Sequence, residues 1–201
     1  MSRRLAMQDT PLPIEIIDTT RPYGGFRNVD VIRYREADRG PERVVKREIM
    51  AAHDAVAVIA WDPARKRLLL IRQFRIAAHV ANGNGMCVEV VAGLIKDDDP
   101  ERTVREEVEE ETGARVVECH HCTTALTSPG MTDEQVQYWF ATVDTTDMVE
   151  QAGLDEETEE TFPFLATLDE ALAMVDEGRV ANGIVMFAVL WFARHFEELA
   201  R

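Results

Sequence analysis

The stretch "VVAGLIKDDDPERTVREEVEEETGARV", residues 90–116, decides the fold because it joins an apolar strand to a helix whose two ends are both marked. The apolar run over residues 86–93 predicts a strand that ends at Gly93. Asp99 is a helix N-cap and Pro100 occupies the first helical position, whereas Gly113 ends the helix. The sequence therefore predicts one helix between these caps.

This helix carries glutamates on the edge of its apolar stripe. Glu107, Glu110 and Glu111 are spaced i, i+3, i+4, so their carboxylates converge, and Glu111 occupies an inward position. Like charges repel at this spacing, and burial adds to the cost. A hard cation such as Mg²⁺ or Mn²⁺ would reverse that interaction. The alternative is a solvated acidic face, which suits Glu106 and Glu109, and spacing alone leaves both interpretations open.

Composition excludes several classes of partner. The chain has 201 residues, 37 acidic and 22 basic, for a net charge of -15 that repels nucleic acid and anionic lipid. The longest apolar run, residues 184–193, is shorter than the ~20 residues that span a bilayer. Three cysteines argue against a disulfide framework. We therefore expect a cytoplasmic protein with neither nucleic acid nor membrane as a partner.

The order of the elements predicts a mixed fold. Residues 1–50 alternate apolar and polar side chains between Gly and Pro turn signals, which predicts a small antiparallel β domain, and residues 51–201 form the main domain. Strands that alternate with helices indicate an α/β (α+β) sandwich rather than a doubly wound parallel sheet. In the main domain we expect strands at 55–61, 67–74, 86–93, 114–126 and 135–143, a short strand after an acidic loop at 149–161, and helices at 168–177 and 183–199.

The helix and the strand before it resemble the Nudix box, G-x5-E-x7-R-E-U-x-E-E-x-G-U, where U is apolar. Gly93 matches the opening glycine, and "EETG" at 110–113 matches the end. The resemblance implies an α/β/α sandwich with a mixed sheet, and hydrolysis of a nucleoside diphosphate linked to another group. The similarity is strongest to the ADP-ribose pyrophosphatase subgroup, through "KREIM" at 46–50, "QFRIAA" at 73–78, "EVVAG" at 89–93, "SPGMTDE" at 128–134, "GLDEETEE" at 153–160 and "GRVANG" at 178–183.

The resemblance also implies roles for individual residues. Glu107, Glu110, Glu111 and the backbone carbonyl of Ala92 resemble the ligands of Mg²⁺, with Mn²⁺ as a substitute. Glu110 is also expected among the catalytic residues. The general base is expected to be a glutamate of the "GLDEETEE" loop, with Glu157 as the first choice and Glu159 as the second.

Substrate binding and assembly are implied in the same way. Arg75, Arg47 and Glu134 resemble residues that bind a nucleoside diphosphate sugar, although Arg75 could instead be an ordinary surface residue of its strand. By analogy with the family, residues 1–50 would form a dimerisation region, so that a homodimer builds the substrate site.

Two departures from the box stand out. Glu106 occupies the position of the box arginine, and the segment from Gly93 to Gly113 is one residue short. A helix that slips by one residue rotates its face by ~100°, so we place the deletion in the loop "KDDD" at 96–99. Asp98 or Asp99 then stands where the family has a glutamate, and Arg105 or Arg102 would compensate for the missing arginine.

The leading hypothesis is a Mg²⁺-dependent enzyme that cuts ADP-ribose to AMP and ribose 5-phosphate. One rival is a hydrolase of a GDP-mannose-type nucleotide sugar. The other is a catalytically impaired Nudix fold that binds nucleotide sugars as a sensor, which Glu106 favours. The "CHHC" run at 119–122 has zinc-ligand types, but on a strand its two cysteines point to opposite faces, so a zinc site is not expected.

Overall fold

The computed structural model describes residues 7–37, 40, 42–153 and 160–200. The chain divides into two compact units. One comprises Met1–Ala52 with Ser128–Asp133, and the other comprises His53–Thr127 with Glu134–Arg201. The metal-site candidates of the helix all lie in the second unit.

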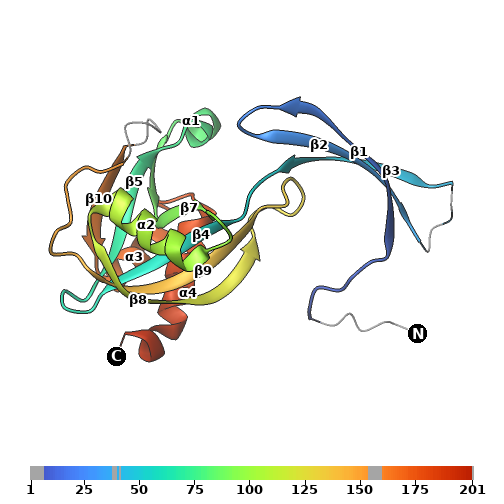
Figure 1. The fold of residues 1–201 in the computed structure, drawn as a ribbon. Helices are drawn as coiled ribbons and strands as arrows, with labels where there is room; N and C mark the ends of the chain where they lie inside the picture. Colours follow the sequence, from blue (N-terminus) through green and yellow to red (C-terminus); the bar gives the residue numbers. More distant parts are fainter. Residues whose placement is uncertain (1–6, 38–39, 41, 154–159, 201) are drawn as a thin grey trace. The chain divides into compact units, whose positions relative to one another are not determined.

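The first unit is a small antiparallel sheet, as the sequence predicts. Its strands, in the order β1 (Ile14–Gly24), β2 (Asn28–Glu36) and β3 (Val44–Ala51), are drawn in blue to teal in Figure 1. The Arg21 guanidinium donates to both oxygens of Asp30, at 2.6 and 2.9 Å, and these hydrogen bonds lower the pKa of that carboxyl. Residues 128–133 join the unit through Thr132, whose hydroxyl donates to the Met50 carbonyl at 2.8 Å. The role of residues 1–50 in dimerisation stays a prediction.

The second unit is built on a mixed sheet. In the described residues the strand order is β10-β5-β4-β9-β8, with β6 paired to β5 and β7 paired to β4. The β4–β9 pair is parallel and the other pairs are antiparallel. The strands are β4 (Ala55–Asp62), β5 (Arg67–Phe74), β6 (Met86–Glu89), β7 (Val91–Leu94), β8 (Arg115–Leu126), β9 (Gln135–Asp144) and β10 (Thr161–Ala166).

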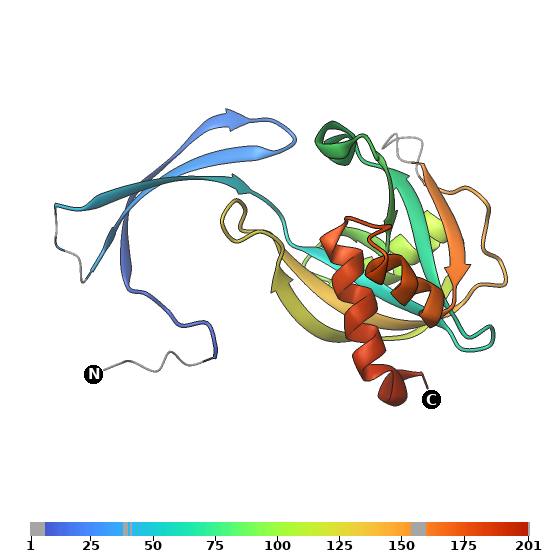
Figure 2. The ribbon, with the colours of Figure 1, turned by 180° about the vertical axis from the view of Figure 1, so that it is seen from behind.

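Helices cover both faces of this sheet, with α2 (Pro100–Thr112) on one face and α3 (Leu168–Asp176) and α4 (Gly183–Leu199) on the other (Figure 1 and Figure 2). The side chains of β4 alternate between two cores, as the two-residue period of a strand requires. Ile59 packs in the core beneath α3 and α4, whereas Val58 packs with Val104 and Val108 of α2. The predicted α/β/α sandwich is therefore confirmed.

Two expectations about elements are wrong. Residues 86–93 do not form one strand, because the chain changes partner at Val90 and leaves β5 for β4. The sequence also gave no sign of α1 (Ile76–Asn82), which begins after Arg75. Its seven residues are too few to produce a clear helical pattern and none of them is buried, and its main local signal is the left-handed Gly83 at its C-cap, with φ 82°.

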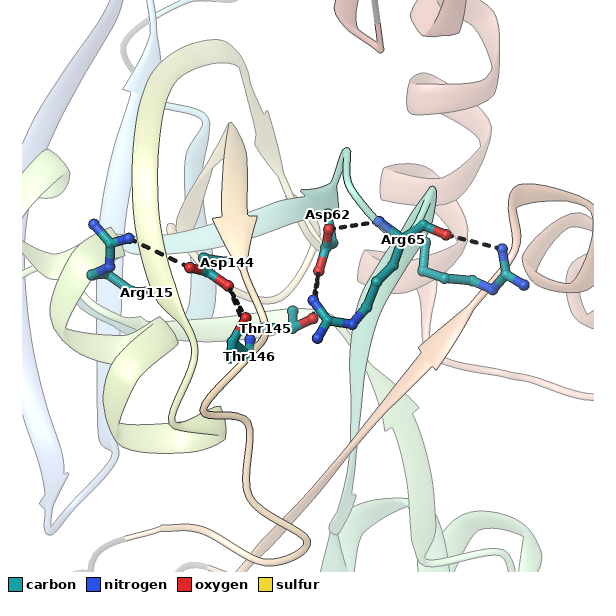
Figure 3. A network of polar contacts seen from close by, with 7 residues as sticks. Asp62, Arg65, Arg115, Asp144, Thr145 and Thr146 are labelled. Atoms are coloured by element: carbon teal, nitrogen blue, oxygen red, sulfur yellow. Dashed lines mark hydrogen bonds and ion pairs between the residues drawn. The ribbon is translucent and has the colours of Figure 1, made fainter.

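A polar network closes the carboxyl end of β4. Asp62, with 1% of its side chain exposed, accepts hydrogen bonds from the Arg65 backbone and guanidinium, each at 2.9 Å, and from the Thr145 hydroxyl (Figure 3). The neighbouring Asp144 accepts from Thr146. Gly93 pairs with a residue near the opposite end of β4, so the network stabilises the sheet away from the candidate site.

A search of the described residues finds no helix with both the length and the apolar character needed to cross a membrane.

Candidate active site

The caps of α2 lie where the sequence predicts them. The Asp99 side chain accepts a hydrogen bond from the Arg102 backbone at 3.0 Å, and Pro100 is the first helical residue. At the other end, Gly113 adopts the left-handed conformation, with φ 71°, and its N–H donates to the Glu109 carbonyl at 2.8 Å. These caps fix which side chains of α2 turn toward the sheet.

The three candidate metal ligands of α2 range from buried to partly exposed. Glu111 is 6% exposed, so it does take the inward position. The side chains of Glu107 and Glu110 are 12% and 34% exposed. Glu109 is exposed, as a solvated glutamate should be. Glu106 is partly exposed and pairs with another residue on the surface of the helix.

Gly93 provides the space that Glu107 occupies. A Cβ atom added to Gly93 would lie 2.2 Å from the Glu107 Cδ atom and 2.3 Å from its Oε1 atom. The carboxyl group therefore rests directly on the backbone of β7, which only glycine permits. Ala92, the candidate carbonyl ligand, precedes Gly93 on the same strand and pairs with Ala57 of β4.

Lys96 lies between two of the carboxylates, and the sequence analysis gave it no role. Its Nζ atom is 3.2 Å from Glu107 Oε1 and 3.7 Å from Glu110 Oε2. Burial lowers the pKa of Lys96, but the charges of Glu107, Glu110 and Glu106 outweigh this effect and raise it overall. Lys96 is thus a cation at neutral pH. The only sign of this contact in the sequence is that Lys96 is a single basic residue followed by three consecutive aspartates.

The loop before α2 is held in a tight turn by its own hydrogen bonds. Asp97 and Asp98 both adopt left-handed backbone conformations, with φ 52° and 54°, which aspartate tolerates better than most residues. The Asp99 N–H donates to the Lys96 carbonyl at 3.0 Å, and the Lys96 N–H donates to the Thr103 hydroxyl at 3.1 Å. The place of the one-residue deletion within this loop stays a prediction.

Of the two arginines expected to compensate for the missing box arginine, Arg102 is the one that pairs with Glu106, and its compensating role stays a prediction. The Arg102 guanidinium donates to Glu106 Oε1 at 2.7 Å and lies 3.5 Å from Asp97. Arg105, the other candidate, instead pairs with Glu101 at 2.8 Å. Glu106, at the position of the box arginine, is therefore paired with a cation from within the same helix.

The acidic loop is anchored on α2 at both of its described ends. The Gly153 N–H donates to the Glu110 carbonyl at 3.3 Å, and the Thr161 hydroxyl donates to the Glu111 carbonyl at 2.8 Å. The candidate bases Glu157 and Glu159 lie outside the described residues. The residues on either side of them, Gly153 and Thr161, are hydrogen-bonded to the backbone of Glu110 and Glu111.

Arg75 is not an ordinary surface residue. Its Nε and terminal nitrogen atoms donate to the Glu89 carboxylate, at 3.1 and 2.8 Å, and Asn182 donates to the same carboxylate at 3.0 Å. The Glu89 side chain is 8% exposed, whereas that of Arg75 is 40% exposed. The guanidinium is therefore held in a fixed orientation while part of it stays accessible. Glu89 lies within the "EVVAG" stretch, but nothing in the sequence indicated that it holds the Arg75 guanidinium.

The two remaining substrate-binding candidates belong to different units. Arg47 is exposed on β3, and its guanidinium donates to the Lys46 carbonyl at 2.8 Å. Glu134 begins the return of the chain to the second unit, and it accepts a hydrogen bond from the Thr127 hydroxyl at 2.9 Å. Their roles in substrate binding stay predictions.

Across the described ranges, no group of three or more His, Cys, Asp or Glu side chains is arranged to hold a metal ion without adjustment. This includes the "CHHC" run on β8. At α2 the donor atoms are the carboxylate oxygens that Mg²⁺ prefers, but the Lys96 ammonium stands between Glu107 and Glu110. The residues fit a divalent cation once this ammonium moves aside.

Comparisons with known proteins agree with this geometry. The model of the NUDIX domain matches residues 51–183. The chain is 31% identical to the ADP-ribose pyrophosphatase of Escherichia coli K12, over 92% of this chain and 90% of that protein. It is 38% identical to the GDP-mannose pyrophosphatase of Cronobacter sakazakii, over 68% of this chain and 72% of that protein.

A solved structure shares the fold. The crystal structure of an ADP compounds hydrolase superposes with a TM-score of 0.73 at 14% identity, and the match covers 94% of this chain and 97% of that one. Together with the box on α2, these matches show that the chain belongs to the Nudix family and is a pyrophosphohydrolase related to ADP-ribose and GDP-mannose pyrophosphatases.

Proposed function

We propose that the protein hydrolyses the diphosphate bond of ADP-ribose, to AMP and ribose 5-phosphate, with Mg²⁺ as its cofactor and Mn²⁺ as a substitute. The observation that carries this proposal is the position of Glu107. Its carboxylate rests on Gly93 and already faces a cation, the Lys96 ammonium, that bridges it to Glu110. The Escherichia coli and Haemophilus influenzae relatives named ADP-ribose pyrophosphatase favour this substrate.

Glu107, Glu110, Glu111 and the Ala92 carbonyl would hold the metal. When bound, divalent cations neutralise the diphosphate charge and activate water for attack on phosphorus. A chain with a net charge of -15 needs such help to bind an anionic substrate. The chain's own contribution is to fix its carboxylates in advance, which the caps of α2 and the contact with Gly93 support.

A loop glutamate would remove the proton of the attacking water. Glu157 is our first choice and Glu159 the second. The anchors at Gly153 and Thr161 support this assignment, because they tie both flanks of residues 154–159 to the Glu110 and Glu111 carbonyls. Variants of the two glutamates to glutamine distinguish them: the base is the one whose loss lowers kcat without weakening metal binding.

Arg75 would bind the diphosphate or the adjoining sugar, with Glu89 and Asn182 holding its guanidinium in place. Arg47 and Glu134 are the two further candidates for substrate binding. We further propose a cytoplasmic homodimer formed through residues 1–50, the part of the chain whose sheet exposes several large apolar side chains, including Ile14, Ile16, Tyr23 and Phe26. Analytical ultracentrifugation tests the dimer, and a monomer at micromolar concentration would contradict it.

A GDP-mannose-type nucleotide sugar is the second candidate substrate, favoured by the 38% identity to the Cronobacter sakazakii protein. The sensor hypothesis rested on Glu106. The Arg102–Glu106 pair weakens it, because the guanidinium neutralises the carboxylate that stands at the position of the box arginine.

A substrate panel tests the proposal. ADP-ribose, GDP-mannose and other nucleoside diphosphate sugars are incubated with Mg²⁺ or Mn²⁺, and the products are identified by mass spectrometry. We expect AMP from ADP-ribose and a loss of at least about 100-fold in kcat for Glu111→Gln. Glu109→Gln is the matched control, since this exposed glutamate lies on the same helix. Turnover that does not depend on a divalent ion, or on Glu111, would refute the proposed site.

A further inference from the structure

Lys96 is placed differently from an ordinary surface lysine. Its side chain is 42% exposed, yet its ammonium contacts a Glu107 carboxylate that is only 12% exposed. Two hydrogen bonds fix the backbone around it: the Lys96 N–H donates to Thr103, a fully buried residue, and the neighbouring Ile95 N–H donates to the Asp54 carbonyl at 2.9 Å. The ammonium thus extends toward the carboxylates from a loop whose backbone is hydrogen-bonded on both sides.

The ammonium and a divalent cation need the same oxygens. Lys96 Nζ lies 3.2 Å from Glu107 Oε1 and 3.7 Å from Glu110 Oε2, whereas a cation bound directly by carboxylates requires its ligand oxygens at about 2.0–2.6 Å. Both cations cannot fit between these two side chains. Metal binding must therefore break both ion pairs and move the ammonium into solvent or onto a bound anion.

We propose that Lys96 is a resident counter-ion that competes with the divalent metal for Glu107 and Glu110, and so sets the metal affinity of the site. The inference rests on the proposed metal site. Without the lysine the closely spaced glutamates would repel one another in the metal-free protein, so the same residue that weakens metal binding stabilises the metal-free state.

Size and charge together define the expected effect. Removal of the ammonium abolishes the competition and leaves the carboxylates with their full negative charge, so Lys96→Met binds the metal more tightly. We expect the dissociation constant for Mn²⁺ to fall on the order of tenfold, equal to about 1.4 kcal/mol. Lys96→Arg keeps the positive charge and stays within about threefold of the wild type. Lys66→Met, in an exposed turn, removes the same charge elsewhere and serves as the control.

The experiment measures Mn²⁺ binding to the full chain without substrate, by electron paramagnetic resonance of free Mn²⁺. Wild type, Lys96→Met, Lys96→Arg, Lys66→Met and Glu107→Gln are titrated in the same buffer. Thermal melting provides a second readout. Metal-free Lys96→Met melts below the wild type, and it gains more stability than the wild type when Mn²⁺ is added.

The outcomes separate the two proposals. Tighter binding by Lys96→Met alone, with binding lost in Glu107→Gln, supports the competition. Wild-type or weaker binding by Lys96→Met, when Glu107→Gln still abolishes binding, overturns the role of Lys96 and leaves the metal site standing. Mn²⁺ binding that is insensitive to Glu107→Gln overturns both.

Discussion

Replacement of Gly93 by alanine is the most direct test of how the site is built. The added methyl group would lie 2.2 Å from the Glu107 Cδ atom, whereas ordinary contacts with a Cβ atom begin near 3.4 Å. The Glu107 carboxyl must therefore retreat by about 1.2 Å, or β7 must shift by a similar distance. A displacement of about 1 Å at a reacting centre costs on the order of 100-fold in rate.

We therefore expect Gly93→Ala to lower kcat/KM for ADP-ribose on the order of 100-fold, or about 2.7 kcal/mol of transition-state stabilisation. Mn²⁺ binding weakens in parallel. The fold persists, because overpacking of this kind costs about 1–3 kcal/mol and part of the strain is relieved by movement of the flexible Glu107 side chain. Release of AMP measures the activity, and circular dichroism measures the melting temperature.

Gly183→Ala is the matched control, since a Cβ atom at this first residue of α4 meets no atom within 4 Å. It should retain wild-type activity and stability. If Gly93→Ala also retained normal turnover and Mn²⁺ affinity, Glu107 would not depend on the space above Gly93, and the proposed construction of the site would be wrong.

Three further predictions concern other contacts. Burial would raise the pKa of Asp62, but hydrogen bonds from Thr145 and Arg65 lower it overall, so its contribution to stability is present above its ordinary value of 3.8 and is lost as pH falls below it. The free energy of unfolding, measured by urea denaturation, should therefore fall more steeply in acid for the wild type than for Asp62→Asn. Thr161→Val removes the hydroxyl bonded to Glu111 and should cost about 1 kcal/mol in urea, with a lower kcat at unchanged Mn²⁺ affinity. Arg75→Lys cannot reproduce the two-nitrogen contact with Glu89 and should raise KM for ADP-ribose about tenfold, measured by initial rates.

The sequence predicted the sandwich and the helix of the box because both depend on local signals. Asp99, Pro100 and Gly113 determine the ends of α2 through short-range contacts, and the apolar runs determine the strands. The break at Val90 was missed because a continuous apolar run gives no sign that the chain changes its partner strand. That exchange depends on tertiary pairing alone.

The candidate site was predictable only in part. The spacing of Glu107, Glu110 and Glu111 follows from helical geometry, so their shared edge could be expected. The contacts of Lys96 and Arg102 could not, because each depends on how the loop before α2 is folded. Glu89 was overlooked for a similar reason, since its partners Arg75 and Asn182 come from distant parts of the chain.

The change of partner strand at Val90 restricts where the chain can vary in length. Glu89, which holds Arg75, ends β6, and Gly93, which receives Glu107, lies on β7 just beyond the exchange. An insertion or deletion of one residue between them would reverse the faces of the side chains on one strand and separate the arginine from the carboxylates. A change of length in the loop at residues 95–99 would instead leave Glu89 and Gly93 on their strands, although it would move Lys96. Homologous chains should therefore keep the four-residue spacing between Glu89 and Gly93.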